Sequence, residues 1–208
     1  MKRFLLALAM AGTALLATAE DKAPAPGKTS PDGVSLEATI EAKEKTFKLD
    51  LGELNSADFK KMIEDAKEKG TPIPQPQKLD FKLVLKNTGK EAIKVYEKGD
   101  SVTIELELKG KGALQATPAL AVTADFRLPQ AVEIEAGKTI ELPIAALAGG
   151  FRGIGHYWYW TEAGEYELVA TFKTGVNPAP KGAADAGDGF GAVQIASKAI
   201  KLKVEAKK

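Results

Sequence analysis

Strict alternation of apolar and polar residues is the feature of this chain that most constrains its fold. The alternation is clearest at the end of an aromatic stretch, residues 157–172, which holds both tryptophans and three of the four tyrosines. The apolar residues at every second position there are Tyr166, Leu168, Ala170 and Phe172. A period of two is typical of a strand that buries one face. A turn at Gly164 separates this strand from the aromatic segment 157–160.

Similar alternating segments recur along most of the chain. They cover residues 34–42, 47–51, 79–85, 93–95, 102–108, 120–126, 132–134, 140–144 and 193–204. The charged residues 43–45 lie between the first two segments and predict a hairpin there. Many short strands separated by turn signals indicate an all-β sandwich, and too few helices are present for parallel crossovers. We therefore predict a single antiparallel β-sandwich domain over residues 33–208.

One segment, residues 56–69, has the periodicity of a helix instead. Its apolar residues are Phe59, Met62, Ile63 and Ala66. They recur at the spacing of one helical face. Asn55 or Ser56 can cap the start, Asp58 places an acid in the first turn, and Gly70 ends the segment. The sequence thus predicts one short helix inserted between strands.

The N-terminus has the pattern of a secretory signal peptide over residues 1–19. Lys2 and Arg3 precede an apolar run of about 13 residues, and Ala17-Thr18-Ala19 matches a small-x-small cleavage site. A membrane-spanning helix needs about 20 apolar residues, so we expect cleavage and no integral membrane segment afterwards. Residues 20–32 are rich in Pro, Ala and Lys and predict a disordered linker. The expected location is periplasmic or extracellular.

Composition argues against several classes of function. The whole chain has 29 basic and 28 acidic side chains, and loss of Lys2 and Arg3 leaves it slightly acidic. Such balance gives no basic surface for nucleic acid. The chain has no Cys and a single His, His156, which is a poor basis for a metal centre or a catalytic triad. We therefore expect a non-enzymatic protein with no cofactor and no metal site.

Two segments resemble a known family. In residues 79–95, apolar and polar residues alternate up to Lys86-Asn87-Thr88-Gly89-Lys90, which is similar to the corner between two strands. In the second segment, Ala163–Leu168, the residues follow a Gly-x-Tyr-x-Leu pattern. Together they resemble immunoglobulin-like or fibronectin III-like domains of exported bacterial proteins, of planctomycete type. The resemblance implies a structural tyrosine corner at Gly164 and Tyr166, whose hydroxyl would bond to nearby backbone. It also implies a hairpin over residues 163–204 and says little about activity.

The aromatic segment is the first candidate binding site. Alternation places Tyr157 and Tyr159 on one face and Trp158 and Trp160 on the other. We expect one pair to face the core and the other to face solvent or the edge of the opposite sheet, where an exposed pair could stack on a sugar or a peptide. The glycine-rich loop before the segment carries Phe151 and Arg152, which can also meet a partner. A second long, glycine-rich loop is expected over residues 174–191, with no complete calcium-binding pattern.

These features predict an exported binding or interaction domain that recognises a protein or a cell-surface polymer. A carbohydrate-binding or carbohydrate-active protein that uses Trp158 and Trp160 as a platform is one alternative. A structural component of the periplasm or envelope is another. If the rings form such a platform, Trp158→Ala or Trp160→Ala should abolish retention on polysaccharides and leave the folded-state circular dichroism intact, whereas loss of folding would assign the rings to the core.

Overall fold

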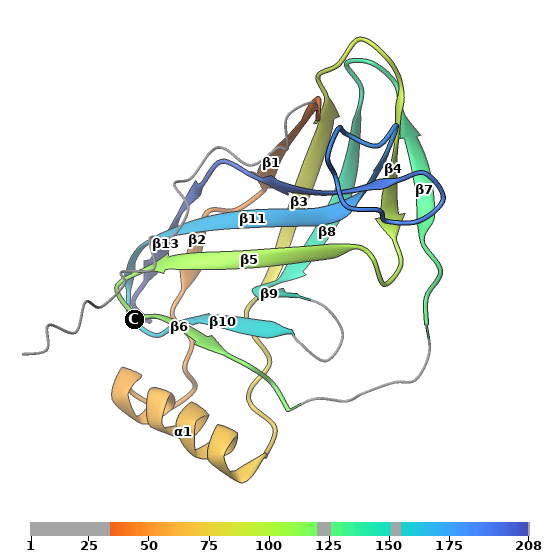
Figure 1. The fold of residues 1–208 in the computed structure, drawn as a ribbon. Helices are drawn as coiled ribbons and strands as arrows, with labels where there is room; N and C mark the ends of the chain where they lie inside the picture. Colours follow the sequence, from red (N-terminus) through yellow and green to blue (C-terminus); the bar gives the residue numbers. More distant parts are fainter. Residues whose placement is uncertain (1–33, 120–125, 151–154, 208) are drawn as a thin grey trace, which may run out of the picture.

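The computed structural model describes residues 34–119, 126–150 and 155–207. The predicted signal peptide, residues 1–19, and the predicted linker, residues 20–32, lie outside this part of the chain. The described residues form an all-β sandwich with one short helix, as the alternation predicts (Figure 1). No helix among them is both long enough and apolar enough to cross a membrane.

Two sheets make up the sandwich. The first contains three antiparallel strands in the order β1-β3-β8: β1 (Leu36–Ala42), β3 (Lys78–Asn87) and β8 (Thr139–Ala146). The larger sheet follows the order β2-β13-β11-β4-β7, with β12 and β5 also paired to β11. Its strands are β2 (Thr46–Lys48), β4 (Ile93–Lys98), β5 (Thr103–Gly110), β7 (Gln130–Ile134), β11 (Gly164–Asn177), β12 (Gly191–Ala196) and β13 (Ile200–Glu205). In Figure 1, β3 and β8 run steeply across β11 and β5.

Strand β11 is the centre of the larger sheet and forms ladders along both edges. Tyr166 is opposite both Leu202 of β13 and Gly110 of β5, so these two strands lie on opposite edges of β11. Phe172 is opposite both Ile195 of β12 and Ile104 of β5, so β12 lies on the edge that β13 occupies. Val176 is opposite both Gly191 of β12 and Val95 of β4, so β4 lies on the edge that β5 occupies. Two consecutive strands, β4 and β5, therefore follow one another along a single edge of β11.

The sheet divides where β4 gives way to β5, and we call this place the fork. Val176 of β11 pairs with Val95, whereas Lys173 pairs with Thr103. Only two residues of β11 lie between these pairs, opposite the seven residues 96–102. The excess chain carries β4 away from β11 beyond Val95, while the other edge of β4 stays paired with β7. Gly175 is required beside this departure, because a Cβ there would lie 2.6 Å from the ring of Tyr96.

The main core lies between the two sheets and is built from the alternating residues. Fully buried members include Leu83, Leu85, Val95, Leu168, Ala170 and Phe172. The predicted hairpin over residues 34–51 is wrong. β1 pairs with β3 in one sheet, whereas β2 runs parallel to β13 in the other. The reason is packing: Phe47 of β2 contacts Trp160 and Phe81, with ring centroids 5.0 and 6.0 Å apart, and so joins the core instead of pairing with β1.

A small third sheet and the helix close one end of the sandwich. The sheet has the order β6-β10-β9, from β6 (Ala113–Ala116), β10 (His156–Trp160) and β9 (Ala148–Gly149). The helix α1 (Ser56–Lys69) lies beyond it (Figure 1). Its predicted bounds are confirmed: the Asn55 side chain accepts a hydrogen bond from the Asp58 amide at 2.9 Å, and Gly70 takes the left-handed conformation at φ 63°.

The loop expected at residues 174–191 is shorter and more tightly packed than the sequence indicates. β11 continues to Asn177 and β12 begins at Gly191. Phe190 is buried and stacks on Tyr96 of β4, with ring centroids 4.0 Å apart. The Tyr96 hydroxyl donates a hydrogen bond to the Gly187 carbonyl at 3.3 Å. These contacts hold the loop against the sheet.

Candidate functional site

The tryptophan face of β10 points into the main core. Trp160 is only 4% exposed and packs between Phe47 and Tyr166. Trp158 is half-buried against the same core, and its indole Nε1 donates a hydrogen bond to the Leu106 carbonyl at 2.7 Å. A buried indole needs such a partner for its N–H. Trp160 is therefore not available as a surface ring, and Trp158 has its polar end committed to β5.

The tyrosine face of β10 is covered by the helix. Tyr159 is buried and meets Phe59 of α1 edge-to-face, with ring centroids 5.4 Å apart. Its hydroxyl donates a hydrogen bond to the Pro74 carbonyl at 2.6 Å. Burial is the main reason that the pKa of this hydroxyl lies above its ordinary value, and neighbouring Tyr157 adds to the shift. Tyr157 is half-buried at the margin of the same cluster.

The aromatic strand is thus an interior layer between the sandwich and α1. The sequence leads to the expectation that one face of this strand is exposed, whereas the structure packs both faces against apolar clusters. The remaining predicted binding residues, Phe151 and Arg152, lie outside the described part of the chain.

The residues assigned to a tyrosine corner make the bonds that this motif implies. Tyr166 is 1% exposed, and its hydroxyl lies 2.7 Å from the Glu162 carbonyl oxygen and 2.9 Å from that of Lys111. Gly110 lies against the ring, and a Cβ there would be 2.5 Å from Cδ1 of Tyr166. Burial raises the pKa of the hydroxyl. The corner joins the β10–β11 turn to the end of β5.

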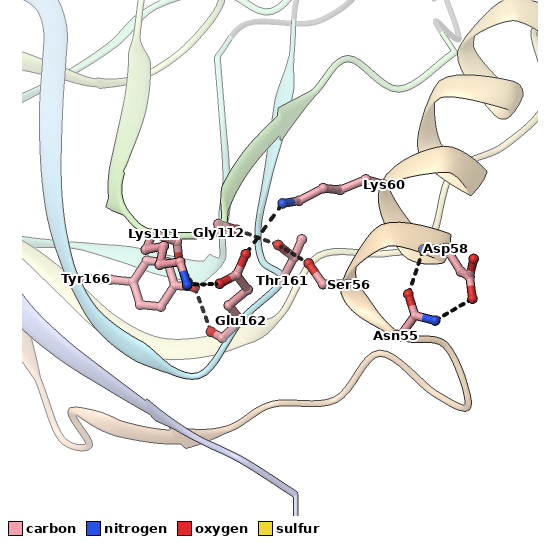
Figure 2. A network of polar contacts seen from close by, with 9 residues as sticks. All are labelled: Asn55, Ser56, Asp58, Lys60, Lys111, Gly112, Thr161, Glu162 and Tyr166. Carbon is pink, nitrogen blue, oxygen red and sulfur yellow. Dashed lines mark hydrogen bonds and ion pairs between the residues drawn. The ribbon is translucent and has the colours of Figure 1, made fainter.

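Polar contacts fasten the start of α1 to the same turn (Figure 2). Ser56 Oγ donates to Thr161 Oγ1 at 3.1 Å, and Thr161 in turn bonds to the Gly112 carbonyl at 3.0 Å. Glu162 pairs with Lys111 at 3.0 Å and with Lys60 of the helix at 3.7 Å. The hydrogen bond from Lys111 is the main cause of a lowered pKa at Glu162. The helix therefore has a defined position over β10.

The polar side chains of the described ranges were candidates for metal ligands or for acid–base groups. No group of three or more His, Cys, Asp or Glu side chains there could hold a metal ion, and no buried polar side-chain atom lacks a hydrogen-bond partner. His156 is half-buried on β10, with Nδ1 at 3.4 Å from Thr117 Oγ1. The Asp185 carboxylate accepts from the Gly187 amide, which fixes a local turn.

A large cavity lies at the fork, and we call it the fork groove. It has a volume of about 850 Å³ and is lined by parts of residues 97–104, 126–130 and 148–150. Val102 and Ile104 of the β5 side form apolar lining, opposite the segment that leads into β7. The groove exists because β4 and β7 diverge from β5 and β9, leaving space between the two arms of the sheet.

Two large apolar side chains stand exposed at this groove. Phe126 is 69% exposed and Leu128 is 74% exposed, far more than the other apolar lining. The sequence places Phe126 in an alternating strand, residues 120–126, most of which lies outside the described residues. The structure shows Phe126 without strand pairing. Sequence reasoning missed this site, since alternation predicts a buried side chain and Pro129 is the only sign of interruption.

Backbone and charge also define the groove. A Cβ at Gly149 would lie 2.7 Å from the Leu106 amide nitrogen, so β9 can approach β5 only with glycine at this position. The Gly150 amide donates to the Ile104 carbonyl at 2.9 Å. At the opposite wall, the Asp100 carboxylate accepts from the Arg127 amide at 3.1 Å. Lys98 pairs with Glu97 at 3.3 Å, so the charges at the rim balance.

No protein-family model matches the chain, and the search of curated proteins found no match.

Proposed function

We propose that this chain is an exported, non-enzymatic interaction domain of immunoglobulin-like type, and that its fork groove holds an extended segment of another protein. The observation that carries the proposal is the exposure of Phe126 and Leu128 beside a cavity of about 850 Å³. Large exposed apolar side chains next to a cavity mark interaction surfaces. The proposed export follows from the signal-like residues 1–19.

A polypeptide fits the chemistry of the groove better than a charged polymer. Among the described lining residues, Glu97 and Asp100 are matched in number by Lys98 and Arg127, so these residues favour neither a polyanion nor a polycation. The buried Trp160 favours this interpretation over a carbohydrate platform on β10.

A cross-linking experiment tests the proposal. A photo-reactive amino acid is placed at position 128 of the full chain in exporting bacterial cells, and the cross-linked polypeptide is identified and purified. Its affinity is then measured for the unmodified chain, for the double variant Phe126→Ser/Leu128→Ser, and for Leu54→Ser. Leu54 is a matched control, since it is 40% exposed and lies outside the groove.

The expected result is a loss of affinity of about tenfold or more in the double variant, because each buried apolar side chain contributes about 1.5–3 kcal/mol. Leu54→Ser should bind as the unmodified chain does. Equal affinity in all three proteins would contradict the proposal. So would retention on a polysaccharide gel that Trp158→Ala abolishes while the folded-state circular dichroism stays unchanged.

A further inference from the structure

A second cavity lies on the other side of β10 and is independent of the fork groove. It has a volume of about 460 Å³ and lies among the segment before α1, the helix itself, the proline-rich connector after it, and β10. We call it the sub-helix pocket. Its apolar walls are Phe59, Met62, Pro74, Pro76, Tyr159 and Trp160.

The walls of this pocket are held in place by contacts already described. Tyr159 is fixed by its bond to Pro74 and its contact with Phe59, and Trp160 by Phe47. Ser56 and Lys60 attach the helix to the β10–β11 turn (Figure 2). A site with fixed walls requires little reorganisation on binding. The aromatic and proline side chains that border the pocket suit an apolar ligand that carries a ring.

The polar groups at the pocket give the ligand a charge preference. Asp50 and Lys78 are its charged lining residues. The Asp50 carboxylate accepts from the Gly52 amide at 3.2 Å and lies 3.5 Å from the Lys207 ammonium, which offsets its charge. Lys78 is exposed and has no ion-pair partner within the described ranges. One unpaired cation thus accompanies an aromatic and proline-lined cavity.

From this combination we infer that the sub-helix pocket binds a small aromatic acid, with the ring among the aromatic and proline side chains and the acidic group at Lys78. The volume lies in the range of small-molecule sites, about 300–1,000 Å³. The pocket shares no lining residue with the fork groove, so this inference does not depend on the proposed function.

A matched pair of probes tests both parts of the inference. 1-Anilinonaphthalene-8-sulfonate has an aromatic body and one anionic group, and N-phenyl-1-naphthylamine has the same ring system without the anion.

The chain has three methionines, of which only Met62 lies in the described ranges. Carbon-13 labelling of the methionine methyl groups, with Met62→Leu to assign the signal, therefore gives a reporter inside the pocket. Lys78→Gln removes the cation, and Lys86→Gln is the control, exposed on the same strand β3 but outside the pocket.

We expect the sulfonate probe to shift the Met62 methyl signal to saturation with one site per chain. Lys78→Gln should weaken that binding by about fivefold to tenfold, the size expected for loss of one charge-assisted contact. The same variant should leave binding of the neutral probe unchanged, and Lys86→Gln should alter neither. An unmoved Met62 signal would overturn the inference. The inference would also be overturned if Lys78→Gln weakened binding of both probes equally, or if it had no effect on either. A third contrary result is a Met62 signal that shifts when the protein alone is diluted, because this would indicate that a second copy of the chain occupies the pocket.

Discussion

The aromatic strand β10 and the segment 126–128 both carry large apolar side chains, yet their environments are opposite. On β10, Trp160 and Tyr159 are almost fully buried, and the polar atoms of Trp158 and Tyr159 bond to backbone carbonyls. In the segment 126–128, Phe126 and Leu128 are mostly exposed beside a cavity. A dense group of aromatic residues therefore marks an interior layer here, whereas two isolated apolar residues mark an exposed surface.

The difference arises because other structural elements pack on both faces of β10 but not on the segment 126–128, as far as the described residues show. β10 lies between the main core and the helix α1, so both of its faces find apolar partners. The segment 126–128 precedes β7, at the arm of the sheet that leaves β11, and nothing among the described residues covers it. Substitutions in the two regions should thus affect different properties, stability in the first and binding in the second.

The largest effect is expected at Trp160. Trp160→Ala removes a buried indole from between Phe47 and Tyr166 and leaves a cavity in the core. We expect a loss of about 3–5 kcal/mol in the free energy of unfolding, measured by urea denaturation. Trp158→Ala should cost less, since that side chain is only half-buried. Equal and small losses in both variants would mean that the two rings are exposed.

A smaller effect is expected from the tyrosine hydroxyls. Tyr166→Phe leaves two backbone carbonyls, those of Glu162 and Lys111, without their donor. The expected cost is about 1–3 kcal/mol in the free energy of unfolding. Tyr159→Phe should also destabilise, through loss of the bond to Pro74. An unchanged unfolding midpoint in Tyr166→Phe would contradict the tyrosine corner.

The same hydroxyls predict a dependence of stability on alkaline pH. Burial raises the pKa of Tyr159 and Tyr166 above the ordinary value of 10.0. The unfolded chain therefore loses these protons first, and stability should fall as the pH rises above about 10. Unfolding compared at pH 8 and pH 11 should show a smaller fall in Tyr159→Phe and Tyr166→Phe than in the unmodified chain. An identical fall in all three proteins would contradict the burial of these hydroxyls.

Glu162 gives a weaker effect of opposite sign. Its pKa is lowered, chiefly by the hydrogen bond from Lys111, so its contribution is present above the ordinary value of 4.5 and is lost on acidification. Glu162→Gln should lower stability slightly near pH 7 and not near pH 3. Thermal unfolding at the two pH values checks this, and an equal loss at both would mean that the carboxylate charge is not involved.

The smallest effect on stability is expected in the segment 126–128. Phe126→Ser and Leu128→Ser replace exposed side chains, and the free energy of unfolding should change by no more than about 0.5 kcal/mol. Urea denaturation of the double variant measures this. A loss comparable with that of Trp160→Ala would mean that these residues belong to the core, and the contrast between the two regions would disappear.

The sequence predicts the helix and most of the strands because these have a local cause, but it misses β6 and β9 and joins β12 and β13 into one strand. Alternation locates β11, and the Asn55 cap with Gly70 fixes both ends of α1. The fork has no such cause. It arises because β4 and β5 share one edge of β11, a long-range pairing that no local pattern encodes. Because local patterns do not encode long-range contacts, the sequence predicts β2 in a hairpin and does not place the helix over the tyrosine face of β10.

The burial of β10 is the claim on which the rest depends, and acrylamide quenching of tryptophan fluorescence tests it most directly. Trp158 and Trp160 are the chain's two tryptophans, so the emission reports on β10 alone. The folded protein should be quenched severalfold less than the same protein in denaturant, and its emission should lie at shorter wavelength. Quenching in the folded state equal to that in denaturant would contradict the interior position of the strand and restore its rings as a surface for a ligand.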